Sequence, residues 1–188
     1  MIINEKKISI AKIFWLIAYY GFARFLPVSN SFGGIGGKIR RIICTHIFKK
    51  VGANINVERM AWFGSGIDIE IGDNSGIGVN AHIPNGTIIG ENVMMGPDCY
   101  ILDINHKFDS LDIPMIKQGH TGKKITHIGN DVWIGRNVFM TPGRTIADHS
   151  IIAACCVLTK DFPEYSIVGG NPSKIIRSRK KEIIKCNE

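Results

Sequence analysis

Large apolar residues recur along this chain at every sixth position. Ile, Met or Leu occupies twelve such positions in two series, namely Ile71, Ile77, Ile83, Ile89, Met95 and Ile101, then Ile128, Ile134, Met140, Ile146, Ile152 and Leu158. A weaker series of Val51, Val57 and Phe63 precedes them and then slips by two residues. In a chain with 45% hydrophobic residues, chance would give twelve in a row with a probability on the order of 10⁻⁴. A period of six is neither helical nor simply alternating, and it predicts short strands joined by corners.

The residues beside each apolar position indicate a three-sided coil. The next residue is often glycine, as at Gly72, Gly78, Gly90, Gly96, Gly129 and Gly135. The fourth residue after each apolar position is often compact, as at Ser75, Ala81, Thr87, Val93, Cys99, Val132, Val138, Ser150 and Cys156. Glycine lets the backbone turn where a Cβ would collide. With three units in a coil, the pattern predicts an all-β parallel β-helix of about five coils, roughly 24 Å tall.

The six-residue period stops between Ile101 and Ile128. Their separation of 27 residues is not a multiple of six, so residues 102–127 are expected to leave the β-helix as a protruding loop. This loop is polar and contains His106 close to its start. Loops held on a rigid scaffold often carry chemistry, and imidazole is suited to accept a proton from a hydroxyl near neutral pH. The alternative is a surface histidine without a catalytic role.

The two ends of the chain differ from the repeats. Residues 1–50 are expected to hold an apolar helix followed by a basic, Gly-rich flexible linker, and residues 173–188 a short basic helix, with the β-helix domain at 51–172. The longest uncharged stretch near the N-terminus, Ile13 to Ala23, has 11 residues, which is too short for the roughly 20 residues of a membrane span. We expect this helix to pack on the body or on a neighbouring subunit, or else to lie on a membrane surface.

Charge is distributed unevenly. Residues 1–50 carry nine Lys/Arg and one Glu, residues 171–188 six Lys/Arg and two Glu, and the segment between them eight Lys/Arg and thirteen Asp/Glu. Basic ends suit an anionic cofactor, a membrane surface or nucleic acid. The nucleic-acid option is not favoured, because no RNP, zinc-finger or helix-turn-helix pattern is present. The five cysteines are odd in number and lack metal-site spacing, which indicates reduced thiols in a cytoplasmic protein.

Two motif-rich stretches carry a family resemblance. "IGNDVWIGRNVFMTPGRTIADHS" and "VLTKDFPEYSIVGGNPSKIIR" are similar to segments of the hexapeptide-repeat acyltransferases, in the branch of galactoside, maltose and capsule-polysaccharide O-acetyltransferases. The match is dense from Ile101 to Arg177. The resemblance implies a left-handed parallel β-helix, acetyl-CoA as the acetyl donor and no metal. It also implies a homotrimer with active sites at the subunit boundaries.

The resemblance further implies a role for individual residues. His106 would be the general base, with Asp103 as a candidate to orient it or to meet the acceptor, and Asn85 as a second acceptor-side candidate. The backbone amide of Arg136 would donate to a developing oxyanion. The residues expected to contact the cofactor are Trp133, Arg136, Ala154, Thr159, Lys160, Lys174 and Arg177, with Trp133 beside the pantetheine arm and Lys174 and Arg177 at the phosphates.

The sequence departs from the family pattern in three places. "AACCV" stands where Ala-Gly-Ser is usual, so that Cys155 adds a side chain where the cofactor would pass close to glycine. Arg144 and Ala147 replace an apolar residue and a glycine within the repeats. These departures concern the pose of the cofactor more than the fold.

The acceptor implied by the resemblance is a sugar hydroxyl, in a surface or capsular polysaccharide or its precursor. The N-terminal helix permits work at the inner face of a membrane. Alternatives are an antibiotic O-acetyltransferase, a non-catalytic trimeric scaffold and a zinc enzyme like the γ-carbonic anhydrases. Five histidines are available for the last, His82, His106, His120, His127 and His149, but none form a His-x4-His pair.

Overall fold

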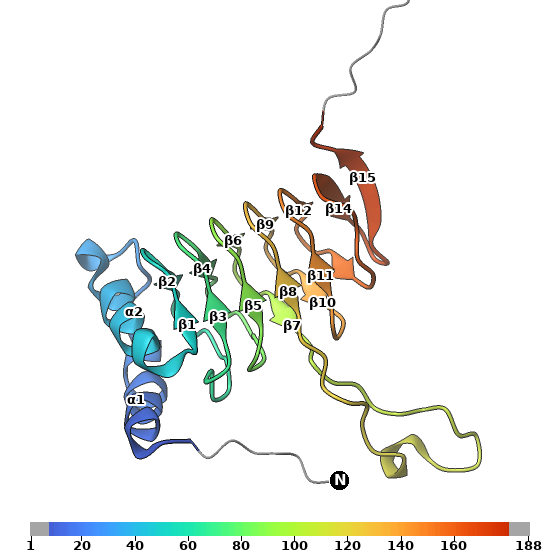
Figure 1. Cartoon of the computed structure of the whole chain (residues 1–188), viewed down its shortest axis with the longest axis horizontal. Helices are drawn as coiled ribbons and strands as arrows, with labels where there is room; N and C mark the ends of the chain where they lie inside the picture. The colour runs from blue at the N-terminus through green and yellow to red at the C-terminus, as the bar shows by residue number, and fades with distance from the viewer. Residues whose placement is uncertain (1–7, 181–188) are drawn as a thin grey trace, which may run out of the picture.

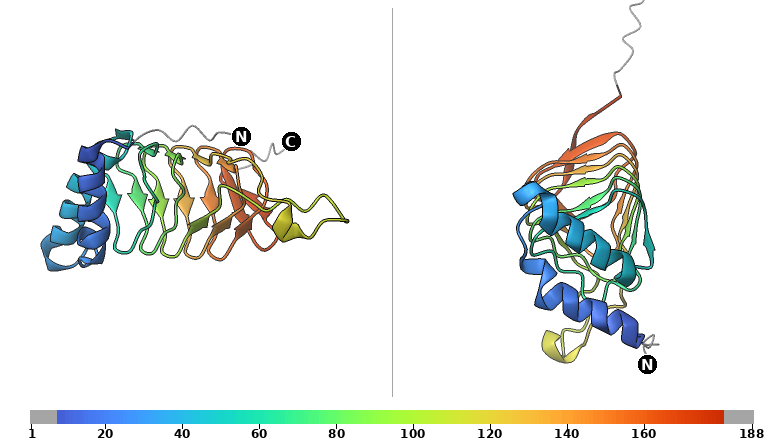
Figure 2. Two further views of the ribbon diagram at one scale, coloured as in Figure 1. Left: turned by 90° about the horizontal axis from the view of Figure 1, so that it is seen from below. Right: turned by 90° about the vertical axis from the view of Figure 1, so that its left-hand side faces the viewer.

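The protein is a three-sided parallel β-helix with two helices across its N-terminal end (Figures 1 and 2). The structure, a computed structural model, describes residues 8–180. The helices are α1 (Ile10–Gly21) and α2 (Ile35–Ile47), with 3₁₀ turns at Ala23–Phe25, Phe32–Gly34 and Met115–Lys117. No helix in this range is long and apolar enough to cross a membrane.

Three walls of short parallel strands build the β-helix. Wall A contains β1 (Lys50–Val51), β3 (Glu70–Ile71), β5 (Ile88–Ile89), β8 (His127–Ile128) and β11 (Thr145–Ile146). Wall B contains β2 (Asn56–Val57), β4 (Gly76–Ile77), β6 (Met94–Met95), β9 (Trp133–Ile134), β12 (Ile151–Ile152) and β14 (Ser166–Gly169). Wall C contains β7 (Tyr100–Ile101), β10 (Phe139–Met140) and β13 (Val157–Leu158). The chain visits A, B and C in turn, as the six-residue period predicts.

The predicted inward positions form the core. In wall A, Ile71, Ile89, Ile128 and Ile146 pair in register across successive strands and are buried. All twelve periodic positions are buried except Met95, which is half-buried. The predicted compact row is buried as well. Each coil therefore covers the apolar residues of the coil below it, which is the main stabilisation available to such short strands.

At the corners, glycine allows the close approach of the next coil, and Asn or Asp adopts the backbone conformation with positive φ. A Cβ added to Gly78 would lie 2.1 Å from the backbone oxygen of Gly96, so glycine is needed there because the next coil passes so close. The backbone with positive φ lies two residues further along, for example at Asn74, Asn80 and Asn92. Asn and Asp tolerate this left-handed conformation better than other side chains.

The predicted flexible linker is wrong for most of its length, because residues 35–47 form α2. Its glycines serve close packing. A Cβ on Gly36 would lie 2.2 Å from the carbonyl oxygen of Pro27, and one on Gly37 would lie 2.9 Å from Cβ of Ser29. Glycine in a basic segment resembles a linker in sequence, whereas here it lets a helix approach the preceding loop.

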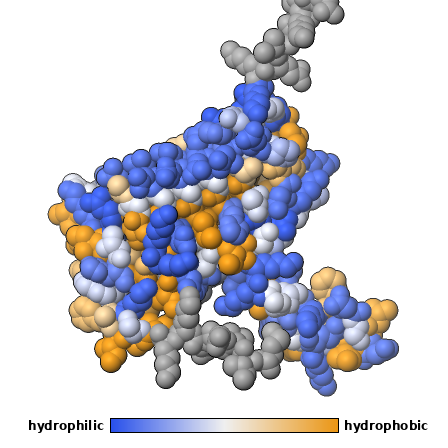
Figure 3. All heavy atoms as spheres, in the orientation of Figure 1, coloured by the Kyte–Doolittle hydropathy of each residue, from blue (hydrophilic) through white to orange (hydrophobic). Residues whose placement is uncertain are grey.

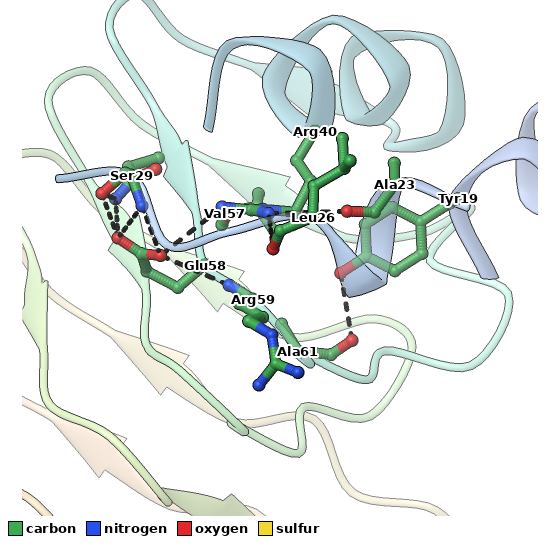
Figure 4. A network of polar contacts seen from close by, with 10 residues as sticks. Tyr19, Ala23, Leu26, Ser29, Arg40, Val57, Glu58, Arg59 and Ala61 are labelled. Carbon is green, nitrogen blue, oxygen red and sulfur yellow. Dashed lines mark hydrogen bonds and ion pairs between the residues drawn. The ribbon is translucent and has the colours of Figure 1, made fainter. Parts of the chain in front are cut away.

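The two N-terminal helices form a cap on the β-helix, and Arg40 of α2 binds this cap to the first coil (Figure 4). The side chain is fully buried. Its guanidinium donates to the carbonyl oxygens of Val57 at 2.6 Å and Leu26 at 2.9 Å, and lies 3.5 Å from the carboxylate of Glu58. Glu58 in turn accepts hydrogen bonds from the amide and hydroxyl of Ser29. Burial is compensated here because the charges are paired and hydrogen-bonded.

The predicted C-terminal helix is also wrong where the structure describes it. Residues Lys174–Ser178 form β15, which pairs antiparallel with β14 at the edge of wall B. The edge of a sheet offers unpaired backbone groups, and the run Ile175-Ile176 favours a strand. The remainder of the prediction, residues 181–188, lies outside the described residues.

Candidate active site

An arm formed by residues 102–127 projects from the corner between walls C and A (Figure 1). The base of this arm is a two-stranded antiparallel ribbon. The amide of Lys107 donates to Gly119 at 3.0 Å, and that of Thr121 donates to Asn105 at 2.8 Å. The period breaks because these residues pair with each other rather than with a neighbouring coil.

His106 lies in this ribbon directly opposite His120. The two residues form an antiparallel bridge, with ring centroids 4.4 Å apart and an interplanar angle of 38°. The imidazole of His106 is exposed and hydrogen-bonds to no other residue within 8–180. Asp103, the predicted orienting residue, instead has its carboxylate 3.7 Å from Nζ of Lys123. The ring is therefore open to an incoming hydroxyl.

Wall B presents the predicted cofactor residues as an outward row. Trp133 is 52% exposed. It pairs in register with Ile151, which pairs with Ile167 of β14, which pairs with Arg177 of β15. Paired residues share a face of the sheet, so the indole and the guanidinium stand on one surface about 14 Å apart, three strand spacings. Lys174 is exposed on the same terminal strand.

The corner between walls B and C lies beside this row. Arg136 pairs with Asp98 through two nitrogens, at 3.1 and 3.0 Å. Hydrogen bonds from Asn80 and then Arg136 hold the pKa of Asp98 below its usual value. The backbone amides of Arg136 and Ala154 donate to no other group among the described residues. They remain available to a ligand, as the prediction for Arg136 requires.

Cys155 follows Ala154 at this corner with φ +60° and an exposed side chain. Its amide donates to the carbonyl of Arg136 at 2.8 Å. Cys155 therefore adopts the left-handed backbone conformation that glycine tolerates best, although it carries a β-carbon. The thiol itself points to the surface and leaves the neighbouring amides open.

The remaining predicted residues serve other parts of the molecule. The amide of Thr159 donates to the hydroxyl of Ser173 at 3.1 Å, and Nζ of Lys160 lies over the ring of Phe162 at 5.5 Å. Asn85 exchanges two hydrogen bonds with Asp68, at 2.9 and 3.0 Å. Asn85 therefore stabilises a corner of the second coil through Asp68.

A single chain does not bring the predicted base and the cofactor row together. His106 is on the arm at the corner of walls C and A, whereas the row from Trp133 to Arg177 covers wall B. Figure 1 shows the arm leaving the β-helix on the side away from β14 and β15. A site that needs both must therefore include parts of two chains.

Sequence reasoning missed two features of the site. It did not identify His120 as the partner of His106, although both histidines lie in one non-periodic segment. It also missed Ser173, which is 2% exposed and ties the turn after β14 to Thr159. Neither pairing follows from a repeat, since the contacts cross between segments of different period.

As to metals, no group of three His, Cys, Asp or Glu suited to an ion occurs within residues 8–180.

Comparisons with known proteins agree on the family. The family model "Bacterial transferase hexapeptide (six repeats)" matches residues 68–103 and 125–160 and leaves out most of the arm. Galactoside O-acetyltransferase from Escherichia coli (strain K12) is 34% identical over 140 residues, which cover 73% of this chain and 68% of that protein.

Solved structures give the same result over most of the chain. A hexapeptide-repeat acetyltransferase from Vibrio cholerae, complexed with acetyl coenzyme A, is 31% identical, with a TM-score of 0.72 and 92% of each chain covered. A maltose O-acetyltransferase from Clostridium difficile 630 is 28% identical, with a TM-score of 0.72, and the match covers 91% of this chain and 87% of that one. This chain belongs to the hexapeptide-repeat acetyltransferases.

Proposed function

We propose that this enzyme transfers the acetyl group of acetyl-CoA to a hydroxyl of a sugar in a surface or capsular polysaccharide or its precursor. The observation that supports the proposal is that the same chain carries an exposed imidazole on the arm and an open row that ends in cations on wall B. Family membership supports O-acetyl transfer. The sugar and its place in a polysaccharide rest on the resemblance to galactoside, maltose and capsule enzymes.

The residues on wall B fit a long anionic cofactor. The indole of Trp133 offers a flat apolar surface, the amides of Arg136 and Ala154 offer donors, and Lys174 and Arg177 offer cations at the far end of the row. Gly135 leaves the space beside the amide of Ala154 free, because a Cβ there would lie 2.5 Å from that nitrogen. Acetyl-CoA would supply a thioester, whose carbonyl carbon is the electrophile that the hydroxyl attacks.

The role of His106 follows from its chemistry. A hydroxyl attacks a carbonyl effectively only if its proton is removed as the new bond forms, and a neutral imidazole nitrogen accepts that proton. The imidazole then holds the proton until it can pass to the departing sulfur. The amide of Arg136 would donate to a carbonyl oxygen that gains negative charge.

We also propose that the enzyme works as a homotrimer in the cytoplasm. The arm of one subunit would bring His106 to wall B of the next, since one chain separates them. The arm exposes large apolar side chains that such a contact would cover: Phe108, Leu111, Ile113, Met115 and Ile116. The cytoplasmic location is supported by Cys44, Cys99 and Cys156, which are buried free thiols, a state that a reducing compartment preserves.

Calorimetric titration with coenzyme A tests the cofactor face, with Trp133→Ala as the variant and zinc content assayed alongside. We expect micromolar binding that weakens at least about tenfold without the indole. Protein without affinity for coenzyme A but with bound zinc would overturn the proposal in favour of a metalloenzyme.

Turnover with acetyl-CoA and a panel of sugars tests the base. We expect His106→Ala to lower kcat by about 10²–10⁴ while coenzyme A still binds. His149→Ala is the matched control, because His149 is exposed at the corner between walls A and B, where it pairs with Asp131 at 2.9 Å, and it should retain full activity. Acetylation of antibiotic hydroxyls in place of sugars would identify the alternative acceptor class.

A further inference from the structure

The outer face of α1 is apolar although it faces solvent. Ile10 is 87% exposed, Phe14 62% and Ile17 67%, and Ile13 completes the row. Their spacing of i, i+3, i+4 and i+7 places all four on one side of the helix. Figure 3 shows hydrophobic side chains gathered over α1 at the lower left of the molecule.

The opposite face of α1 already packs against the protein. Tyr19 is buried and donates to the carbonyl of Ala61 at 3.0 Å, while Trp15 stacks on His46 of α2 with centroids 4.2 Å apart. Burying this face is enough to fix the helix on the β-helix. The exposed apolar row is therefore not required for folding, and an amphipathic surface helix would normally be polar there.

The apolar surface extends beyond α1 around the same end of the molecule. Phe22 and Phe25 follow α1 and are more than half exposed, as are Ile35 and Ile42 on the outer side of α2. Between the helices, Phe32 is 80% exposed with φ +50°. The end-on view in Figure 2 shows α1 and α2 side by side across the end of the β-helix. We call these residues, with the row on α1, the cap face.

The segment that carries the cap face contains basic residues and no acidic ones. Residues 8–50 contain no Asp or Glu, and they contain seven basic residues: Lys12, Arg24, Lys38, Arg40, Arg41, Lys49 and Lys50. Lys38 is exposed on the same side of α2 as Ile35 and Ile42. Lys38 and Arg41 form no ion pair with any residue between 8 and 180. They are thus available to an external anion.

We propose that the cap face docks on an anionic lipid bilayer, with α1 lying in the interface and the cations of α2 meeting the headgroups. Aliphatic and aromatic side chains next to Lys and Arg are the combination that interfacial helices use. With 12 residues, α1 lies on a membrane rather than across it. A second copy fits less well, because two cap faces would bring like charges together, whereas anionic headgroups complement them. This inference does not depend on acetyl transfer.

Vesicle flotation of the full chain tests the proposal with two lipid mixtures, phosphatidylcholine alone and phosphatidylcholine with one quarter phosphatidylglycerol. We expect binding to the anionic vesicles that falls at least about tenfold in Phe14→Ser/Ile17→Ser. Lys38→Gln/Arg41→Gln should weaken binding to the anionic vesicles and leave the weak binding to neutral vesicles unchanged. The matched control is Ile175→Ser/Ile176→Ser, which removes two exposed apolar side chains from β15, at the other end of the β-helix, and should not affect flotation.

Sedimentation velocity and turnover on a soluble sugar accompany each variant. The proposal is supported if the cap-face variants keep the oligomeric state and turnover of the wild type while losing vesicle binding. It is overturned if the wild type does not float with anionic vesicles, or if Phe14→Ser/Ile17→Ser floats equally well. Dissociation of the oligomer in that variant would also overturn it and would assign the cap face to contact between copies.

Discussion

At the scale of single residues, this fold depends on how closely successive coils approach. Six glycines follow inward aliphatic residues, and the added Cβ at each would come within 3 Å of the next coil. The left-handed corners tolerate more variety. They accept Asn, Asp, His and Cys, so Cys155 is strained in its backbone but sterically allowed. At these six positions the requirement is for space beside the strand, whereas the left-handed corner conformation is a preference.

Gly78→Ala is expected to destabilise the protein by about 1–3 kcal/mol, because the new methyl group would lie against the backbone of Gly96 and the coils would have to separate. Gly76→Ala, two residues earlier, is the control. A Cβ there has its nearest neighbour at 3.7 Å, and the change should stay within about 0.5 kcal/mol. Thermal unfolding of both variants checks this, and equal midpoints would show that coil contact does not explain the glycine.

At the scale of elements, the sequence predicts what repeats and fails where it does not. Five coils and their inward residues follow from the period, since one residue in six must fill the core. The predictions for α2 and β15 are wrong because each element depends on tertiary contacts, with the preceding loop and with β14, that no repeat in the sequence reveals. Gly36 and Gly37 resemble a linker until Pro27 and Ser29 are placed against them. The same holds for His106 and His120, whose pairing depends on how the arm folds back.

The joint between the cap and the first coil should make stability depend on pH. Burial alone would raise the pKa of Glu58, but hydrogen bonds from the side chains of Ser29 and Asn56 and from backbone amides hold it below the usual value. The unfolded chain therefore binds this proton more readily. The stabilisation is present above the ordinary carboxyl range and is lost as pH falls through the lowered pKa of the folded state.

Glu58→Gln is accordingly expected to lower the free energy of unfolding by about 1–3 kcal/mol at pH 7, and the difference from wild type should shrink as pH falls below about 4.5. Urea unfolding at pH 7 and at several values between about 3 and 5 measures it. Glu91→Gln, at an exposed position, should show a small difference at every pH. A difference for Glu58→Gln that stays constant with pH would contradict the account.

At the scale of the whole molecule, the β-helix separates the two halves of the proposed site. One chain presents the proposed base on its arm and the proposed cofactor row on wall B, and the packed core of the β-helix lies between them. Cyclic assembly solves this, because a rotation repeats one contact between unlike surfaces until the ring closes. In the proposed assembly, the exposed apolar residues of the arm would contact the neighbouring chain.

This arrangement predicts complementation between inactive subunits. His106→Ala lacks the base and Trp133→Ala/Arg177→Ala has a damaged cofactor row, so each variant alone should be nearly inactive. In a mixed oligomer formed by co-expression, some boundaries combine an intact arm with an intact wall B. Random mixing in equal amounts gives such a boundary at roughly one quarter of the sites.

Turnover of differently tagged, doubly purified oligomers measures the effect, and mixing the two variants after purification, without exchange of subunits, is the control. Recovery to about a third of wild-type activity, since each doubly purified mixed trimer has one productive boundary among three, would mean that the base and the cofactor row come from different chains. If the mixed oligomers stay inactive while both variants assemble, the site must lie within one chain. Because the core is closely packed at every coil, that result would require the arm itself to fold back across the corner to wall B.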